Sequence, residues 1–216
     1  MKDLSILTKN ALFIGLSMRE ITDFLSAIPC SEKVFQPEDI LVHEGDVITH
    51  LGIILSGLAV GKKYGLGGEE IIVSRLSVNK IFGDVLSGAN GFASPVTVQA
   101  CEVCRVLFID YKSLLYSPHS LNHKILQNMI QNISLKYFAQ NMRLDILMLK
   151  SVREKVLVYL NYQRTLRGNS TFEINLDRRL LSDYLGVDRS ALSRELSKMK
   201  ADGLIDFKKS VFTLKY

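Results

Sequence analysis

The segment from Ile174 to Ile205, INLDRRLLSDYLGVDRSALSRELSKMKADGLI, constrains the fold more than any other part of the chain. Apolar residues recur at helical spacing on both sides of Gly186, a glycine that can adopt the left-handed conformation that ends a helix. Asp177 and Asp188 stand before the two runs, where a short carboxylate accepts hydrogen bonds from the first helical turn. Gly203 ends the second run. The segment therefore predicts two short helices joined by a tight turn.

The outer face of the second predicted helix is basic and carries short polar side chains: Arg189, Ser190, Ser193, Arg194 and Lys198. An α-helix fits the major groove of B-DNA, arginine can donate two hydrogen bonds to a guanine edge, and small hydroxyl residues allow close approach. An ordinary pair of surface helices has the same pattern, so the interpretation as a recognition helix needs further support.

Two further features favour DNA binding. A β-hairpin is predicted after the helix pair, from Leu204–Phe207 and Val211–Leu214, and this wing has Lys208 and Lys209 at its turn, where they can meet phosphates. Residues 151–216 contain 13 Lys and Arg against 8 Asp and Glu, whereas residues 1–150 contain 14 of each, so the whole net charge of +5 lies in the last third. Such basic charge is what a phosphate backbone attracts.

The rest of the chain has two further patterns. From Cys30 to Ile109, short runs rich in Val and Ile alternate with glycine-containing turns, which is typical of an antiparallel β-roll and not of a βαβ fold. Helical spacing precedes Pro29, with a capping box at Ser17 and Glu20. Between Pro118 and Lys150 there is no proline or glycine, which predicts one helix of about 30 residues, much longer than average.

The long predicted helix has two apolar faces, and each face needs a partner. Lys136, Tyr137 and Gln140 interrupt the apolar spacing of one face. We expect this face to form a homodimer interface along the seam Leu126, Met129, Ile133, Tyr137, Gln140, Leu144 and Leu147. We expect the other face to pack on the β-roll: Leu121, Ile125, Ile130, Phe138 and Met142. A linker helix buried within one subunit is the alternative.

These patterns predict an α+β chain of three segments: N-terminal helices and β-roll (1–117), a long dimerisation helix (118–150) and a winged helix-turn-helix domain (151–216). No apolar run approaches the length of a membrane span, and the first residues lack the apolar core of a signal peptide, so we expect a cytoplasmic protein without a membrane partner. The chain has three cysteines, an odd number that does not suit a framework of paired disulfides, so we expect reduced thiols.

In order and length, these segments resemble the Crp/Fnr family of bacterial transcription regulators. The resemblance covers nearly the whole chain and rests on five motifs: Glu44-Gly45-Asp46, Ile53-Ile54-Leu55-Ser56-Gly57, Phe82-Gly83-Asp84, Val152-Arg153-Glu154-Lys155-Val156, and LSDYLGVDRSALSREL from Leu181 to Leu196. It implies a cyclic-nucleotide-binding-like jelly roll and a homodimer that binds a two-fold symmetric operator in double-stranded DNA. It also implies RNA polymerase as a partner through surface loops, for which Arg167–Thr171 is the candidate by position.

The resemblance also implies roles for single residues. Arg189 and Arg194 fall where family members place base-contacting arginines. Arg178 falls where a phosphate contact is usual, with Arg179 beside it. Ser190 departs from well-known members, which carry glutamate at this position, so the best-known operator of the family is not expected here.

The segment that resembles the family's effector pocket is Phe82, Gly83, Asp84 and Val85, followed by Ser94, Pro95, Val96 and Thr97. Members that bind cyclic AMP place an arginine where this chain has Ser94, followed by a serine or threonine where it has Pro95. A hydroxyl does not replace a bidentate, charge-assisted contact with the cyclic phosphate. The departure argues against cyclic AMP and leaves an unknown small-molecule effector. The alternative is an effector-independent regulator whose β-roll is only a dimerisation scaffold.

Other cofactors and activities have less support. Family members with an iron–sulfur cluster use four cysteines, and this chain has three, which argues against a cluster. Cys101 and Cys104 have metal-knuckle spacing only if they form a turn, and His119 and His123 lie one helical turn apart, so their roles stay open and no metal site is predicted. No nucleophile–base pair or phosphate loop indicates an enzyme.

Overall fold

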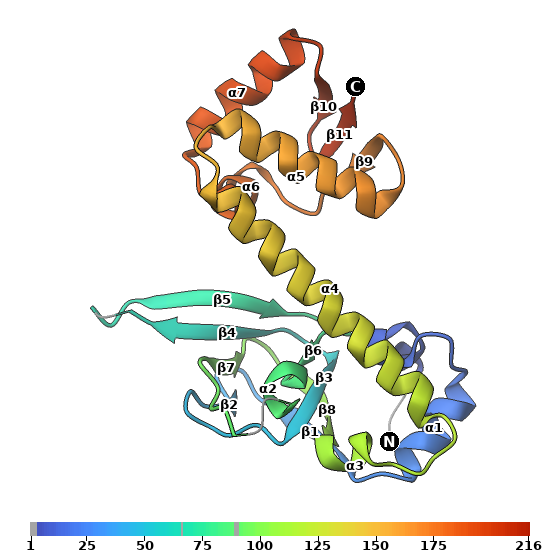
Figure 1. Ribbon diagram of the computed structural model, residues 1–216. Coiled ribbons are helices and arrows are strands. Elements are labelled where there is room, and N and C mark those ends of the chain that lie inside the picture. Colours follow the sequence, from blue (N-terminus) through green and yellow to red (C-terminus); the bar gives the residue numbers. More distant parts are fainter. Residues whose placement is uncertain (1–3, 66, 89–90) are drawn as a thin grey trace. The chain divides into compact units, whose positions relative to one another are not determined.

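A computed structural model describes residues 4–65, 67–88 and 91–216 (Figure 1). The chain divides into two compact units, Met1–Leu135 and Lys136–Tyr216. The long helix α4 (Asn122–Met148) contributes its first half to one unit and its second half to the other. The predicted segment 118–150 extends a few residues beyond this helix at each end.

Short helices begin the N-terminal unit: η1 (Ser5–Lys9), η2 (Ala11–Phe13) and α1 (Met18–Ser26). The predicted capping box before α1 is confirmed, because the Glu20 N–H donates to the Ser17 hydroxyl and the Ser17 N–H donates to the Glu20 carboxylate at 2.7 Å. The box satisfies backbone donors that would otherwise face solvent unpaired, and it fixes the residue at which the helix begins.

The predicted β-roll is confirmed as two four-stranded antiparallel sheets. In spatial order, the first sheet contains β1 (Cys30–Phe35), β8 (Cys104–Asp110), β3 (His50–Ser56) and β6 (Ile81–Phe82). The second contains β2 (Ile40–Val42), β7 (Thr97–Ala100), β4 (Ala59–Tyr64) and β5 (Glu70–Leu76). The sequence did not single out β1 or β6, nor the short helices α2 (Asp84–Gly88) and α3 (Tyr111–Leu115).

The first sheet is covered on both faces. Leu51, Ile53 and Leu107 point to a core shared with the N-terminal helices and the first half of α4. Ile54 and Val106 point the other way, into the core between the two sheets. This double burial explains why β3 and β8 are continuously apolar in sequence, whereas a strand with one solvated face alternates.

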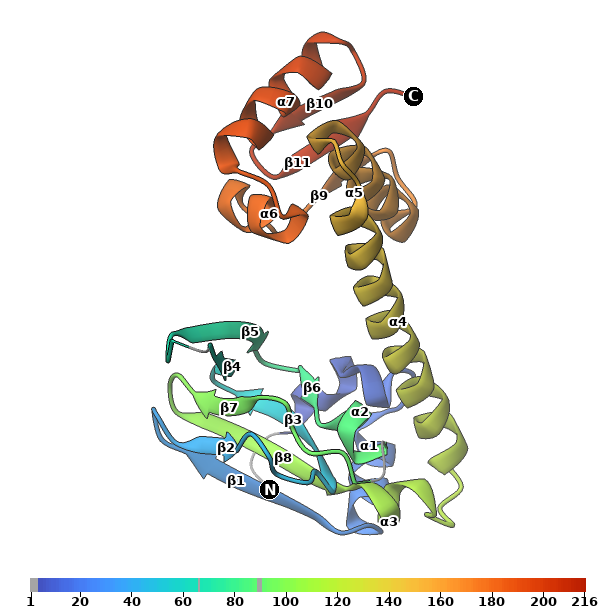
Figure 2. The same cartoon turned by 60° about the vertical axis from the view of Figure 1, so that its left-hand side comes forward.

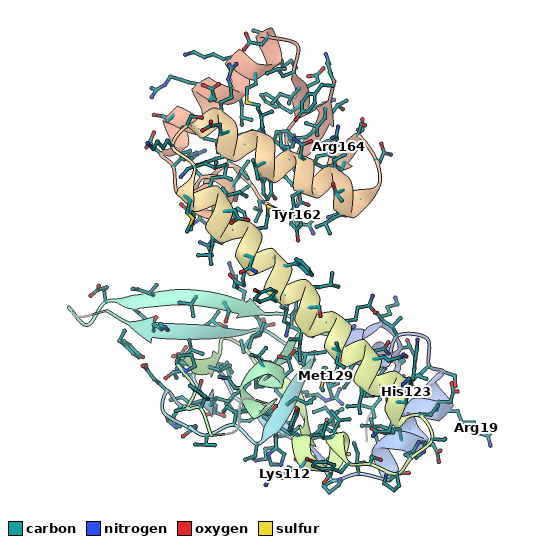
Figure 3. All side chains as sticks on the ribbon, viewed as in Figure 1. Arg19, Lys112, His123, Met129, Tyr162 and Arg164 are labelled. Carbon is teal, nitrogen blue, oxygen red and sulfur yellow. The ribbon has the colours of Figure 1, made fainter. Side chains whose placement is uncertain are left out.

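The structure corrects the assignment of apolar faces on α4. Met129, labelled in Figure 3, is only 6% exposed and belongs to the N-terminal core, so it is not on a free face. Ile130 and Phe138 were expected to pack on the β-roll, but they are 62% and 63% exposed, and Met142 packs in the C-terminal core. With Ile130 in place of Met129, the seam alternates between steps of four and three residues: Leu126, Ile130, Ile133, Tyr137, Gln140, Leu144 and Leu147.

The C-terminal unit is a winged helix-turn-helix, as predicted. Its elements are α5 (Val152–Arg167), β9 (Thr171–Glu173), α6 (Arg178–Leu185), α7 (Arg189–Ala201), β10 (Ile205–Lys208) and β11 (Val211–Leu214). The sheet order is β10-β11-β9, and β9 was not predicted. Leu160, Leu192 and Phe212 are fully buried where the helices meet this sheet. In the described part of the chain, no helix has the length and apolar character to cross a membrane.

A glycine in the first sheet provides a test of its packing. Gly52 lies opposite Phe82 on one side and Phe108 on the other, and a Cβ at this position would overlap the Phe82 ring. Gly52→Ala should therefore lower the free energy of unfolding by about 1–3 kcal/mol, measured by chemical denaturation. In a Phe82→Leu background the same substitution should be less destabilising, and an equal effect in both backgrounds would contradict the overlap.

Candidate functional site

Local capping defines the helix-turn-helix. The Asp177 carboxylate accepts from the Leu180 N–H at 2.8 Å, and Gly186 ends α6 with a φ of +62°. The Asp188 carboxylate accepts from the N–H groups of Ser190 and Ala191 at 2.8 and 2.9 Å and begins α7. The caps predicted at these three residues are confirmed, and they fix where the two helices meet.

Two cations of α5 hold the helix pair in place. Arg153 donates from Nε to the Glu195 carboxylate of α7 at 2.5 Å and from a terminal nitrogen to Asp202, just beyond α7, at 2.7 Å. Lys155 is buried and donates to the carbonyl of Leu185 at the end of α6, at 3.1 Å. These positioning roles were not predicted, because only contacts distant in sequence reveal them. The resemblance had marked both residues without assigning a role.

The outer face of α7 presents unpaired cations. Arg189, Arg194 and Lys198 are exposed, and none has a salt bridge within the described residues. At the wing turn, Lys208 and Lys209 are also exposed and have no ion pair in the same part of the chain. These charges are therefore available to phosphates and to base edges.

The serines of this face already have acceptors within the helix. The Ser190 hydroxyl donates to the Asp188 carboxylate at 2.5 Å, and the Ser193 hydroxyl donates to the carbonyl of Arg189 at 3.0 Å. A base that is to accept from either hydroxyl must first draw it away from this acceptor. The small size of both side chains still lets α7 approach a groove closely.

The two arginines at the start of α6 differ. Arg178 is half-buried, with its guanidinium over the rings of Phe207 and Phe212 at 4.8 and 5.0 Å from their centroids. Burial lowers the pKa of Arg178, although a guanidinium remains charged at neutral pH. Arg179 is exposed and makes only a loose pair with Asp183, at 3.6 Å. The sequence had not suggested that Arg178 also joins α6 to the wing.

The first half of the predicted effector segment turns from β6 into α2. Phe82 is 9% exposed, and Gly83 has a φ of +75°, with the carbonyl of His50 where a Cβ would stand. Asp84 is buried and accepts a hydrogen bond from the side-chain amide of Asn132 on α4 at 3.1 Å. Val85 is exposed. The carboxylate of this segment is thus already held by a helix of the same unit.

The second half of the segment is also paired internally. Ser94 is buried, and its hydroxyl donates to the carbonyl of Val96 at 2.7 Å, whereas Pro95 is exposed. The Thr97 hydroxyl accepts from the Glu44 N–H at 3.1 Å. The hydroxyls of Ser94 and Thr97 are thus both hydrogen-bonded within the β-roll.

The candidate metal ligands are dispersed. No group of three or more His, Cys, Asp or Glu that could hold a metal is found among residues 4–65, 67–88 and 91–216. Cys101 is exposed in a turn, whereas Cys104 is buried in β8, where burial raises the pKa of its thiol. His119 lies 3.1 Å from the Asp23 carboxylate, and His123 is exposed on α4 (Figure 3).

Known domains match both parts of the chain. A cyclic nucleotide-binding domain matches residues 32–116, and a Crp-like helix-turn-helix domain matches residues 154–215. The first match begins within β1 and ends just after α3, and the second contains α6, α7 and the wing.

Three similar proteins illustrate the range of relatives. The rice (Oryza sativa subsp. japonica) potassium channel KOR2 is 31% identical over 72% of this chain and 22% of the channel. The four plant potassium channels that match are much longer proteins, and this chain spans only 12 to 22% of their length. The transcriptional activator protein FnrA of Stutzerimonas stutzeri is 27% identical over 89% of this chain and 80% of FnrA. The catabolite activator protein of Thermus thermophilus has the same fold, with a TM-score of 0.55 and 20% identity over 95% of this chain and 93% of that one.

The cap of α7 predicts a pH dependence. The hydroxyl of Ser190 and the N–H of Ala191 hold the pKa of Asp188 below its usual range, so its ionised form stabilises the folded state. This stabilisation is complete above the ordinary pKa of aspartate and is lost as pH falls through the lowered value. Between about pH 5 and pH 2, the melting temperature of Asp188→Asn should fall less steeply than that of the wild type.

Ser190→Ala provides a matched control for this pH dependence. It leaves the carboxylate in place but removes its strongest donor, so the acid transition should move to higher pH. If the wild type and both variants lose stability along parallel curves, the Asp188 cap is not the titrating group.

Proposed function

Because the chain belongs to the Crp/Fnr family of transcription regulators, with a cyclic nucleotide-binding domain and a Crp-like helix-turn-helix domain, we propose that it acts as a homodimer on a two-fold symmetric operator. The family regulates transcription by binding DNA and is not enzymatic. The observation that most directly supports this proposal is the outer face of α7, where Arg189, Arg194 and Lys198 have no salt bridge within the described residues. A regulator of this kind works with the DNA in the cytoplasm.

In the proposed complex, α7 lies in the major groove. Arg189 and Arg194 donate to base edges, with Ser190 and Ser193 between them at close approach. Phosphates on both sides are contacted by the cations around α7: Arg178, Arg179, Lys198, Lys208 and Lys209. The exposure of Lys198, Lys208 and Lys209 and the confinement of net charge to residues 151–216 support this division.

The proposed dimer interface is the seam of α4 with the corrected register. Ile130, Tyr137 and Leu144 follow each other at steps of seven residues and are 62%, 62% and 54% exposed. Residues seven apart return to the same side of a helix, so two copies of α4 can bury this stripe against each other. Leu126 and Ile133 extend the seam from the half-buried side.

We propose that cyclic AMP is not the effector. Ser94 and Pro95 stand where nucleotide-binding members have their phosphate-binding pair, and the Ser94 hydroxyl is used within its own turn. RNA polymerase stays a proposed partner through the loop between α5 and β9, Arg167–Thr171.

DNA recognition can be tested by selecting bound duplexes from random DNA with the purified protein. A palindromic motif should appear, and Arg194→Ala should weaken binding to it by about 1–3 kcal/mol while changing binding to random DNA much less. Arg167→Ala, at the exposed end of α5, is the matched control and should bind as the wild type does. If Arg194→Ala lost the same affinity for the motif and for random DNA, Arg194 would not be a base-contacting residue.

The dimer can be tested by sedimentation. Leu144→Glu places a charge in the proposed seam and should convert the dimer to a monomer, because an unpaired carboxylate is not tolerated between apolar helices. Gln131→Glu, exposed on the same helix but outside the seam, should leave the dimer intact. A wild-type monomer, or dissociation by both variants, would refute this interface.

A further inference from the structure

A cavity of about 420 Å³ opens between the two sheets of the β-roll, and of the predicted effector segment only Phe82 lines it. Its other walls come from β1, β2, β8 and the chain that leads into β3. Figure 2 shows β1 and β2 at the same edge of the β-roll. The volume lies in the range of about 300–1,000 Å³ that is usual for small-molecule sites.

Three aromatic rings form the floor of this cavity. Phe108 lies opposite Ser31 on one neighbouring strand and opposite Gly52 on the other, and Gly52 in turn lies opposite Phe82. Because Gly52 has no side chain, the Phe82 ring reaches over β3 and meets Phe108 edge to face, with centroids 6.0 Å apart. Phe35 meets Phe108 from the other side at 6.2 Å. The floor is therefore apolar and built of rings that favour a further aromatic ring.

The opposite wall is aliphatic, from Ile40, Leu41, Val42, Val47 and Ile48. Three polar side chains at the rim, Asp46, Thr49 and His50, have hydrogen-bond partners. The Asp46 carboxylate accepts from the His43 N–H at 2.8 Å, and His50 Nδ1 lies 2.8 Å from the Thr49 hydroxyl. A flat apolar body fits between this wall and the phenylalanine floor.

The lining of the cavity contains one lysine, Lys33, and one carboxylate, Asp46. Lys33 points to the cavity from β1 with its ammonium 5.6 Å from the Phe108 ring centroid, and it has no salt bridge within the described residues. By contrast, Glu32, next to it on the other face of β1, is paired with Arg105 at 2.7 Å. The exposed ammonium of Lys33 lies beside an aromatic floor and can pair with an anion attached to an apolar body, while the Asp46 carboxylate is bound by the backbone of its own turn.

We propose that this cavity binds a small aromatic carboxylate, with its ring against Phe35, Phe82 and Phe108 and its carboxylate on the Lys33 ammonium. The site does not need the phosphate-binding arginine that the effector segment lacks. Binding at this cavity does not depend on the proposed operator binding or on the proposed dimer, so a negative result in either of those tests would not contradict it.

The test is calorimetric titration of the full chain with phenylacetate, its neutral analogue 2-phenylethanol, and acetate. Phenylacetate should bind about tenfold more tightly than 2-phenylethanol, because only the anion gains the charge-assisted contact, and acetate should give no measurable binding. Lys33→Met keeps the stem of the side chain without its charge. It should weaken phenylacetate about tenfold and leave 2-phenylethanol unchanged.

Two further variants locate the site. Lys63→Met makes the same replacement on β4, outside the cavity, and should bind all three compounds as the wild type does. Val47→Trp adds bulk at an exposed rim position and should abolish binding of both aromatic compounds. The proposal is overturned if phenylacetate does not bind at millimolar concentration, if Lys33→Met binds it as tightly as the wild type, or if Val47→Trp has no effect.

Discussion

The strands β3 and β8 bury apolar side chains on both faces of one sheet, and the N-terminal unit depends on this double burial. On one face, Leu51 and Leu107 attach the short N-terminal helices and the first half of α4. On the other, Ile54 and Val106 attach the second sheet. Both faces of the sheet are closely packed in its centre, and the cavity lined by Lys33 and Phe35 opens beside the edge strand β1.

The same constraint explains how much of this unit was predictable. Continuous apolar runs marked β3 and β8 in the sequence, and glycine-containing turns marked the strand ends. The strand β1 was not evident, because CSEKVF has few apolar residues and is defined by its partner β8, more than 60 residues away. On α4, spacing alone did not separate Met129 from Ile130, since neighbouring positions both fit an imperfect seam. Only the contact of Met129 with a distant core decides between them.

The DNA-binding unit was easier to predict from the sequence, because the residues that define its helices act locally. The caps at Asp177 and Asp188 and the glycine at Gly186 each act within one helical turn, so their residue types suffice to place both helices. The tie from Arg153 to Glu195 and Asp202 joins positions more than 40 residues apart, and nothing in their local sequence indicates it. The helices that carry the candidate recognition residues are thus predictable from sequence, while the contacts that orient these helices are found only in the fold.

The hydrogen bond from Ser190 to Asp188 has a consequence for the information content of the operator. The Ser190 hydroxyl contributes little binding free energy with any particular base, because it must give up its hydrogen bond to the Asp188 carboxylate to form a new one. In the proposed complex, the base pair that faces Ser190 should therefore vary more among natural sites than the base pairs proposed to be contacted by the two arginines. A regulator that tolerates any base pair at one operator position can bind more promoter sequences. New sites can then arise by fewer base changes in the DNA, without a change in the recognition helix.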